Sequence, residues 1–270
     1  MSDVMQKRAA FRALHRDGCF VIPNPWDIGS ARLLQQLGFA ALATTSSGFA
    51  WTAGRADYAV TRDDTLTHLA ALCAAVDLPV NADFQSGFAD APEAVAENVR
   101  LAAATGIAGL SIEDRIGAGP GLHEHRLAVE RIRAARAAIA DQDVFLVARA
   151  EGLLFDPGSL SAVIDRLIAF AAAGADCLYA PGVQGAANIA VMVRAVAPKP
   201  LNVLMSGPGL SAAELADLGV RRISVGGALA RVAWGAVRRA AEEMRQGSFE
   251  GLKEAASGKE MNALFAPFAT

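Results

Sequence analysis

The residues best suited to chemistry in this 270-residue chain each follow a short apolar run. Asp83 comes directly after residues 80–82, Glu113 follows residues 110–112, and Arg149 ends the next such run. The C-terminal ends of parallel strands meet at one edge of a sheet or barrel, so these three side chains are expected to converge. Carboxylates gathered in a small cavity need a cation or a shared proton to offset their repulsion.

Two arrangements can supply that positive charge. One is a Mg²⁺ or Mn²⁺ ion, because these cations take oxygen ligands and keep waters in the remaining positions. Asp83 is then the best direct ligand, since it ends a strand rather than standing on a loop. The other is an ion-pair network that closes the barrel mouth, with Arg149 and Arg115 as the basic partners. Both interpretations stay open on the residues alone.

Small polar residues and glycines follow other apolar runs. Ser46, Ser47 and Gly48 offer hydroxyl groups and close backbone approach, which suit a carboxylate or phosphate oxygen. Serines in this position can equally serve as helix or turn caps. Gly207 and Gly227 fall at the usual phosphate position of a barrel, although glycines also serve tight turns.

The elements that must position these residues alternate along the chain. Eight short apolar runs predict strands, and segments of helical period, such as residues 92–104, lie between them. Strand–helix alternation predicts right-handed crossovers and a parallel sheet, so the fold class is α/β, a (β/α)8 TIM barrel. An open doubly wound sheet is the main rival, but no G-x-G-x-x-G follows the first run. The runs are 20–23, 41–45, 80–83, 110–114, 144–149, 177–180, 201–205 and 222–225.

The predicted organisation is a single domain, 1–270, with the barrel at about 20–246 and a helical tail at about 247–270. The tail carries more apolar surface than a free tail normally shows. It therefore either folds back over its own barrel or docks on another subunit. The apolar tail residues are Met261, Leu264, Phe265 and Phe268.

Composition limits the partners. The net charge of −3 gives no basic footprint for nucleic acid, and no apolar run is long enough to cross a bilayer. The three cysteines lack metal-site spacing and fit a reducing compartment. We expect a cytoplasmic protein whose partner is a small carboxylate substrate.

Six motifs in order resemble the isocitrate lyase and phosphoenolpyruvate mutase superfamily, including its 2-methylisocitrate lyase-like and carboxyphosphonoenolpyruvate phosphonomutase-like members. The resemblance spans roughly residues 20–247. The motifs are Asn24-Pro25-Trp26-Asp27, Thr44-Thr45-Ser46-Ser47-Gly48, Asn81-Ala82-Asp83, Ser111-Ile112-Glu113-Asp114, Ala148-Arg149-Ala150-Glu151 and Arg222-Ile223-Ser224-Val225-Gly226.

The resemblance implies a Mg²⁺-dependent enzyme acting on small 2-oxo or 2-hydroxy acids through a metal-stabilised enolate. It assigns Asp83 as the direct metal ligand, with Asp57, Glu113 and Gln85 acting through water. The implied catalytic residues are Arg149, Asp57 and Glu113. The resemblance also implies a homotetramer or homodimer that exchanges a late helix between subunits. The implied substrate-binding residues are Ser46, Ser47, Gly48, Trp26, Asp27, Arg149 and Asn202.

Two departures from the family pattern affect the expected reaction. Gln85 stands where the family has a second acid, which removes one negative charge. The loop 115–125 lacks the cysteine that C–C lyases use as a proton donor. Its His123-Glu124-His125 cluster either supplies acid–base function or forms a solvated loop tip at a helix start, and we favour the second interpretation.

The leading hypothesis is a lyase-type enzyme that cleaves a C–C or P–C bond without the usual cysteine. One alternative is a metal-free barrel that grips a phosphorylated substrate through Gly207 and Gly227. Another is a barrel that binds 2-oxo acids and has lost catalysis.

Overall fold

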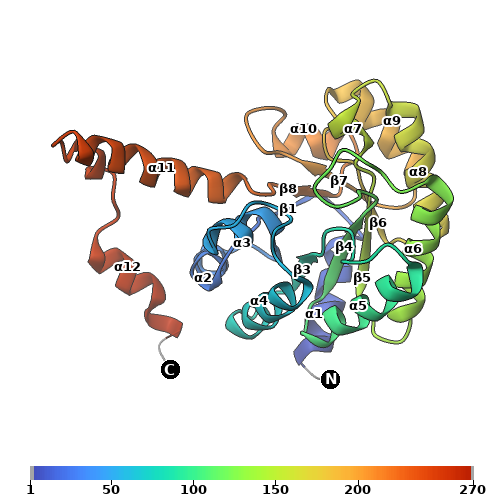
Figure 1. Cartoon of the computed structure of the whole chain (residues 1–270), viewed down its shortest axis with the longest axis horizontal. Coiled ribbons are helices and arrows are strands. Elements are labelled where there is room, and N and C mark those ends of the chain that lie inside the picture. The colour runs from blue at the N-terminus through green and yellow to red at the C-terminus, as the bar shows by residue number, and fades with distance from the viewer. Residues whose placement is uncertain (1–2, 269–270) are drawn as a thin grey trace.

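A computed structural model of the protein describes residues 3–268, so Met1 and Thr270, the ends of the predicted domain and tail, lie outside the described residues. Eight parallel strands form one sheet with helices around it (Figure 1). The strands confirm the eight predicted runs, although most are shorter. They are β1 (Phe20–Ile22), β2 (Leu42–Ala43), β3 (Val80–Asp83), β4 (Gly109–Glu113), β5 (Phe145–Arg149), β6 (Cys177–Tyr179), β7 (Leu201–Leu204) and β8 (Arg222–Ser224).

Helices connect successive strands and cover the outside of the sheet. Helix α5 has the bounds that the sequence predicts, because Pro92 fixes its first turn and Gly106, with φ of +94°, ends the segment. The helices are α1 (Asp3–Leu14), α2 (Ile28–Gln36), α3 (Ser46–Thr52), α4 (Arg62–Ala75), α5 (Pro92–Ala104), α6 (His125–Ala138), α7 (Gly152–Phe155), α8 (Leu160–Ala172), α9 (Ala186–Val196), α10 (Ala212–Asp217), α11 (Ala228–Arg245) and α12 (Gly258–Phe265), with short 3₁₀ turns η1 (Glu250–Leu252) and η2 (Ala266–Phe268).

The strand order β1-β8-β7-β6-β5-β4-β3-β2 brings β1 and β2 to the two ends of the hydrogen-bonded sheet. The backbone N–H of Ala43 donates to the carbonyl of Pro23 at 3.0 Å and bridges these ends. Buried Asn24 reinforces the bridge, since its amide donates to the Thr44 carbonyl and accepts from the Val225 N–H, both at 2.9 Å. These contacts close the barrel and bring the C-terminal ends of β1, β2 and β8 together.

Helix α1 covers the N-terminal end of the barrel, and the sequence pattern gave no sign of it. Its Phe11 is fully buried against Gly109, where an added Cβ would lie 2.8 Å from the Phe11 ring. Arg8 is also buried and donates to the carbonyls of Ile107 and Ala103 at 3.1 and 2.8 Å. The helix is polar on average, and these two anchors bind segments distant in sequence. The hydrophobic period of the sequence therefore does not reveal helix α1.

The C-terminal segment leaves the barrel as the long helix α11, and α12 lies beside α2 (Figure 1). Only Ala230 is buried among the residues of α11, whereas Val232 and Val237 are 67% and 60% exposed. The tail does touch its own barrel, because the Arg32 guanidinium lies 4.7 Å from the centre of the Phe268 ring. Within residues 3–268, no helix is both long and apolar enough to span a membrane.

Candidate active site

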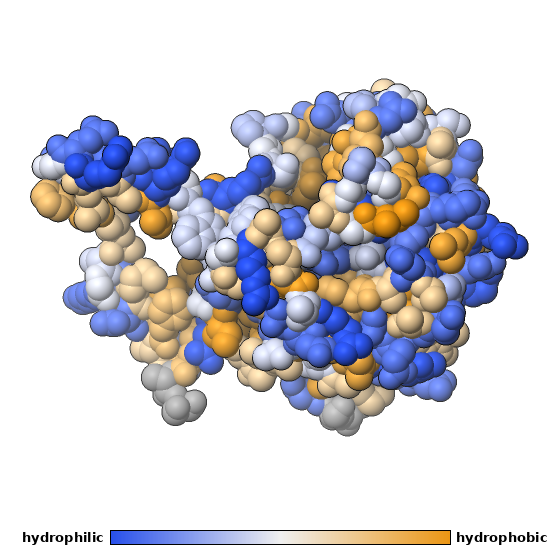
Figure 2. Space-filling model, viewed as in Figure 1, coloured by the Kyte–Doolittle hydropathy of each residue, from blue (hydrophilic) through white to orange (hydrophobic). Residues whose placement is uncertain are grey.

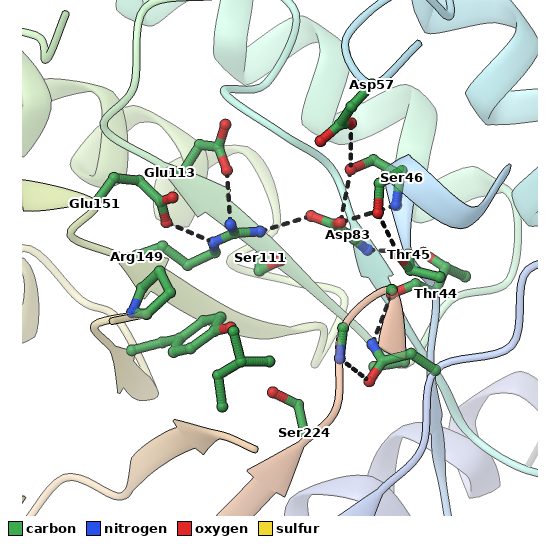
Figure 3. Close-up of a pocket in the computed structure, with 18 of the residues that line it drawn as sticks. Thr44, Thr45, Ser46, Asp57, Asp83, Ser111, Glu113, Arg149, Glu151 and Ser224 are labelled. Carbon is green, nitrogen blue, oxygen red and sulfur yellow. Dashed lines mark hydrogen bonds and ion pairs between the residues drawn. The ribbon is translucent and has the colours of Figure 1, made fainter. Parts of the chain in front are cut away.

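A cavity of about 210 Å³ opens where the C-terminal ends of the strands meet. The residues that line it include Ser46 and Ser47 of α3, Asp83, Glu113 and Arg149, as the sequence predicts. Figure 3 shows Arg149 at the centre, with carboxylates converging on it from different strands. The mouth is therefore built around one buried cation.

Arg149 ends β5, and its guanidinium contacts three carboxylates. It donates to Asp83 at 2.8 Å, to Glu113 at 2.9 Å and to Glu151 at 2.9 Å (Figure 3). The same group lies 5.2 Å from the centre of the Tyr179 ring. Burial lowers the Arg149 pKa, but the surrounding acids outweigh it and raise the pKa well above the ordinary value. Arg149 therefore keeps its charge at every physiological pH.

Asp83 is held from two sides. One carboxylate oxygen accepts from Arg149, and the other accepts from both the backbone N–H and the hydroxyl of Ser46, at 2.9 Å each. The Asp83 backbone N–H donates to the Thr44 hydroxyl at 2.8 Å, which fixes the end of β3 against β2. Both oxygens of the Asp83 carboxylate thus have partners at the mouth of the barrel.

Glu113 is buried and receives a short hydrogen bond from the Tyr58 hydroxyl at 2.5 Å. Its burial raises its pKa to about 8; Arg149 opposes the shift, and Glu151 and Asp83 add to it. Burial therefore favours the neutral form of Glu113 in spite of its contact with Arg149.

Asp57 lies on the loop after α3 and also lines the cavity. Its carboxylate accepts from the Tyr58 backbone N–H at 3.0 Å and lies 3.5 Å from the Ser46 hydroxyl. Burial raises the pKa of Asp57, and the charge of Asp83 raises it further. Four acids, Asp57, Asp83, Glu113 and Glu151, thus surround Arg149.

A second layer behind the mouth fixes Glu151. Asp114 accepts from the Glu151 backbone N–H at 2.9 Å and from Arg166 at 3.1 Å. Asp114 is buried, and burial raises its pKa to about 6. This layer explains why Glu151 can hold a fixed orientation although it stands two residues beyond the strand.

The floor of the cavity holds a second buried cation. Arg222 lines the cavity, and its Nε donates to the side chain of Asn202 at 2.8 Å. Asn202 is fully buried and donates to the Ser224 hydroxyl at 2.9 Å, so it supports Arg222 instead of reaching the cavity. One Nη of Arg222 has no partner among the described residues, which leaves a buried donor at the bottom of the site.

The structure places several predicted site residues outside the cavity lining. Asp27 caps α2 by accepting from the Ser30 N–H at 2.7 Å, and Trp26 precedes that cap. Gly48 is buried in α3, where an added Cβ would lie 2.7 Å from Thr45 and 2.9 Å from Trp26, so it serves packing. These three residues and Asn202 hold the scaffold of the site instead of facing its cavity.

Gln85 also lies outside the cavity lining, against its predicted role in holding metal-bound water. It adopts a φ of +47° after β3, and its backbone carbonyl accepts from the Glu113 N–H at 2.9 Å. Its side chain is buried, and the amide nitrogen has no partner within residues 3–268. The turn at Gln85 aligns the ends of β3 and β4.

Sequence reasoning missed Tyr58 and did not select Glu151 for the site. Tyr58 has a φ of +65° on an irregular loop, and its ring lies 4.6 Å from the Arg115 guanidinium. No periodic pattern marks such a residue. Glu151 offered a signal, because it follows Arg149 by two residues and parallel strands direct alternate residues to the same face.

The His123-Glu124-His125 cluster lies outside the cavity lining. Glu124 caps α6 by accepting from the Arg126 and Leu127 N–H groups, which fits the predicted helix start. His123 is buried rather than solvated and lies 3.7 Å from Asp90.

No three His, Cys, Asp or Glu side chains in residues 3–268 are already arranged as a metal site. The cavity nevertheless offers carboxylate and hydroxyl oxygens, which hard cations such as Mg²⁺ prefer, beside the guanidinium groups of Arg115, Arg149 and Arg222. These residues fit one direct carboxylate ligand and water, provided that the ion takes the place of a present partner of Asp83.

A buried arginine ringed by acids, at the mouth of a (β/α)8 barrel, defines an enzyme site for a small anionic substrate. Residues 11–245 match the phosphoenolpyruvate phosphomutase family. A crystal structure of a proposed lyase/mutase from Burkholderia cenocepacia J2315 is similar, with a TM-score of 0.94, 49% identity and 98% of both chains covered.

Two relatives have named activities. The 2-methylisocitrate lyase of Escherichia coli K12 is 33% identical over 180 residues, 63% of this chain and 60% of that protein. An oxaloacetate decarboxylase of Paraburkholderia xenovorans is 30% identical over 230 residues, 81% of this chain and 74% of that protein. The chain belongs to the phosphoenolpyruvate phosphomutase family, within the isocitrate lyase and phosphoenolpyruvate mutase superfamily, and is an enzyme.

Proposed function

We propose that this enzyme cleaves a C–C bond in a small 2-oxo or 2-hydroxy carboxylate through an enolate. The observation that carries the proposal is the contact of Arg149 with Asp83, Glu113 and Glu151 at 2.8–2.9 Å. A fixed, desolvated cation of this kind stabilises charge that develops on a substrate oxygen. The relatives support the class, since their names refer to 2-methylisocitrate and oxaloacetate.

The chain's own residues can bind and orient such a substrate. Arg149 forms fork-shaped contacts and can exchange one acid partner for a substrate carboxylate. The hydroxyls of Ser46 and Ser47 line the same cavity and can donate to a second oxygen. When a 2-oxo acid loses its β-carboxylate as CO₂, the electron pair of the broken C–C bond moves onto the 2-oxo oxygen and gives an enolate. When a 2-hydroxy acid is cleaved, its hydroxyl loses a proton and becomes a carbonyl, and the electron pair moves onto the carboxylate of the other fragment. Arg149 would stabilise either charge until a proton from solvent completes the product.

We also propose that the site uses Mg²⁺ or Mn²⁺. Asp83 would hold the ion directly, and Asp57 and Glu113 would hold its water. A bound divalent cation would act as a Lewis acid toward the developing enolate charge. The carboxylate and hydroxyl oxygens that line the cavity support this, because hard divalent cations prefer oxygen ligands.

The phosphate-binding alternative has less support. Gly207 lines a separate cavity without charged residues, whereas Gly227 lines the catalytic cavity, so the two glycines do not form one anion cradle. Loss of catalysis also has less support, because the acids and Arg149 form a connected network at the mouth.

The test of the function is turnover of malate, oxaloacetate, alkylated malates and citrates, and phosphonopyruvate with Mg²⁺, followed by product detection. Arg149→Lys keeps the charge but loses the three-way fork, so kcat/KM should fall on the order of 10²-fold or more. Arg133→Lys on the exposed face of α6 is the matched control and should stay within about twofold. Equal activity in both variants, or no turnover of any compound, would contradict the proposal.

A further inference from the structure

A second cavity of about 710 Å³ lies beside the catalytic cavity, under the loops that follow β6 and β7. Its walls include Val183, Ile189, Val203, Met205 and Leu210. Ile189 and Val203 are buried in the barrel core, which fixes this wall. The cavity is thus larger than the catalytic cavity, and its lining combines these apolar side chains with Gln184, Ser206 and several glycines.

The two cavities are neighbours and share two lining residues. Leu154 of α7 and Leu204 at the end of β7 line both. Leu154 is 47% exposed, although it stands beside a charged site. Figure 2 shows apolar residues gathered over the part of the barrel that Figure 1 labels α7. Leu154 and Leu204 are therefore the residues that a substituent of a ligand held by Arg149 would contact on the side of the second cavity.

The second cavity differs from the first in charge. None of its lining residues carries a charge, and all of them lie within the described part of the chain. The Arg231 guanidinium comes near, donating to the Ser206 carbonyl at 3.1 Å, but it is not part of the lining. A cavity without a charged lining residue favours an uncharged group over a second carboxylate, because no cation in its lining can pair with that charge.

We infer that the second cavity binds an apolar substituent of the substrate, an alkyl or aryl group of about four carbons or more. The substrate is then a 2-oxo or 2-hydroxy acid with its charged end at Arg149 and its hydrocarbon end beyond Leu154 and Leu204. This inference rests on the proposed function and specifies its substrate class. A buried methylene changes affinity about fourfold, so a butyl group should bind at least about tenfold better than hydrogen.

A substitution at Gly207 can fill the second cavity without a clash. It lines the cavity, has an ordinary φ, and an added Cβ would meet no atom within 4 Å. Gly207→Leu therefore adds hydrocarbon without a backbone clash. Gly258, at the first position of α12, has the same open surroundings and an ordinary φ, so Gly258→Leu is the matched control.

The experiment compares malate, 3-methylmalate and 3-butylmalate in Mg²⁺ buffer, by kcat/KM and by apparent Kd from ligand-dependent melting temperature. In the wild type and Gly258→Leu, 3-butylmalate should exceed malate at least about tenfold in kcat/KM and affinity. In Gly207→Leu this advantage should fall to about twofold or less, with malate values unchanged. Met205→Glu, which places a charge in the cavity, should remove the advantage in the same way if Gly207→Leu does not fold.

Two failures can be told apart. Equal values for malate and 3-butylmalate in the wild type, or an advantage that survives in both cavity variants, would overturn the inference while leaving the lyase function intact. Absence of turnover for all three compounds would count against the proposed function. The binding measurements then still decide whether the second cavity holds the butyl group.

Discussion

At the scale of single residues, charge balance sets the chemistry of the mouth. Arg149 meets three acids at 2.8–2.9 Å, and Asp57 adds a fourth acid to the cavity. The ion-pair network that the sequence predicts as one alternative at the barrel mouth is present for Arg149. Arg115 instead stacks on Tyr58 and donates to carbonyls of its own loop.

The cysteines lie apart from the cavity, so we predict that no thiol takes part in catalysis. Cys177 is buried, and burial raises its pKa to about 11; Cys73 lies in α4 with a pKa raised to about 12 by burial. Neither they nor Cys19 lines the cavity. Replacing each by Ala should leave kcat within a few-fold in steady-state assays. A loss on the order of 10²-fold in a folded single variant, as for a removed acid–base group, would contradict this.

The positions of most residues at strand ends could be predicted from the sequence. The strand boundary and the alternation of side chains along the strand show which of these residues face the cavity. Asp83, Glu113 and Arg149 reach the cavity as predicted. Asn202 could not be placed, since the sequence does not show that it stands below the mouth layer, against Arg222. A residue near the end of a strand can lie below the cavity, where it supports other side chains and does not face the ligand.

At the scale of elements, strands and helices with strong periodicity were predictable, and elements set by distant contacts were not. The α5 bounds follow from local signals, Pro92 and Gly106. Helix α1 instead depends on Phe11 and Arg8 contacting β4 and neighbouring segments. Helix α3 was also missed, because its seven residues are too few to display a helical period.

Helix α1 makes a prediction about stability and pH. His15, directly after its last residue, donates from Nδ1 to the Phe11 carbonyl at 2.8 Å and stacks on Phe145 with ring centres 4.0 Å apart. Burial, with a smaller effect of Arg222, lowers its pKa to about 3. Below pH 6.5 the unfolded chain therefore binds a proton that the folded chain does not, and stability falls as pH falls.

His15 alone should lower the free energy of unfolding by about 1.4 kcal/mol per pH unit between about pH 6 and pH 4. Urea unfolding of the wild type and His15→Phe at several pH values measures this slope. The variant should lose that part of the slope, because phenylalanine retains the stacking without the proton site. Parallel curves for the two proteins would show that His15 is not buried in its neutral form.

At the scale of the whole molecule, helix α11 leaves the barrel with only Ala230 of its residues buried. Figure 2 shows hydrophilic residues on one side of this projecting helix and more apolar residues on the side toward α12. Valines at 60–67% exposure are costly to leave in water. We propose that α11 packs on a second copy of the chain, in a homodimer or homotetramer.

The prediction is that the wild type is a homo-oligomer at micromolar concentration, measured by light scattering after size-exclusion chromatography. Val232→Glu with Val237→Glu should shift the mass toward the monomer, because both charges would be buried in the contact. Val191→Glu, at a 41% exposed valine of α9, is the control and should keep the assembly. A wild-type monomer would contradict the proposal.

We propose that a divalent cation, Asp83 and Arg149 act together when the enzyme cleaves a small 2-oxo or 2-hydroxy acid. The most direct measurement is the product formation rate in Mg²⁺, in EDTA, and in EDTA with excess Mg²⁺ restored, for the wild type and Asp83→Asn. We predict activity that EDTA abolishes and Mg²⁺ restores, and a loss on the order of 10²-fold or more in Asp83→Asn. Full activity in EDTA, together with an Asp83→Asn rate within about twofold of the wild type, would contradict the account.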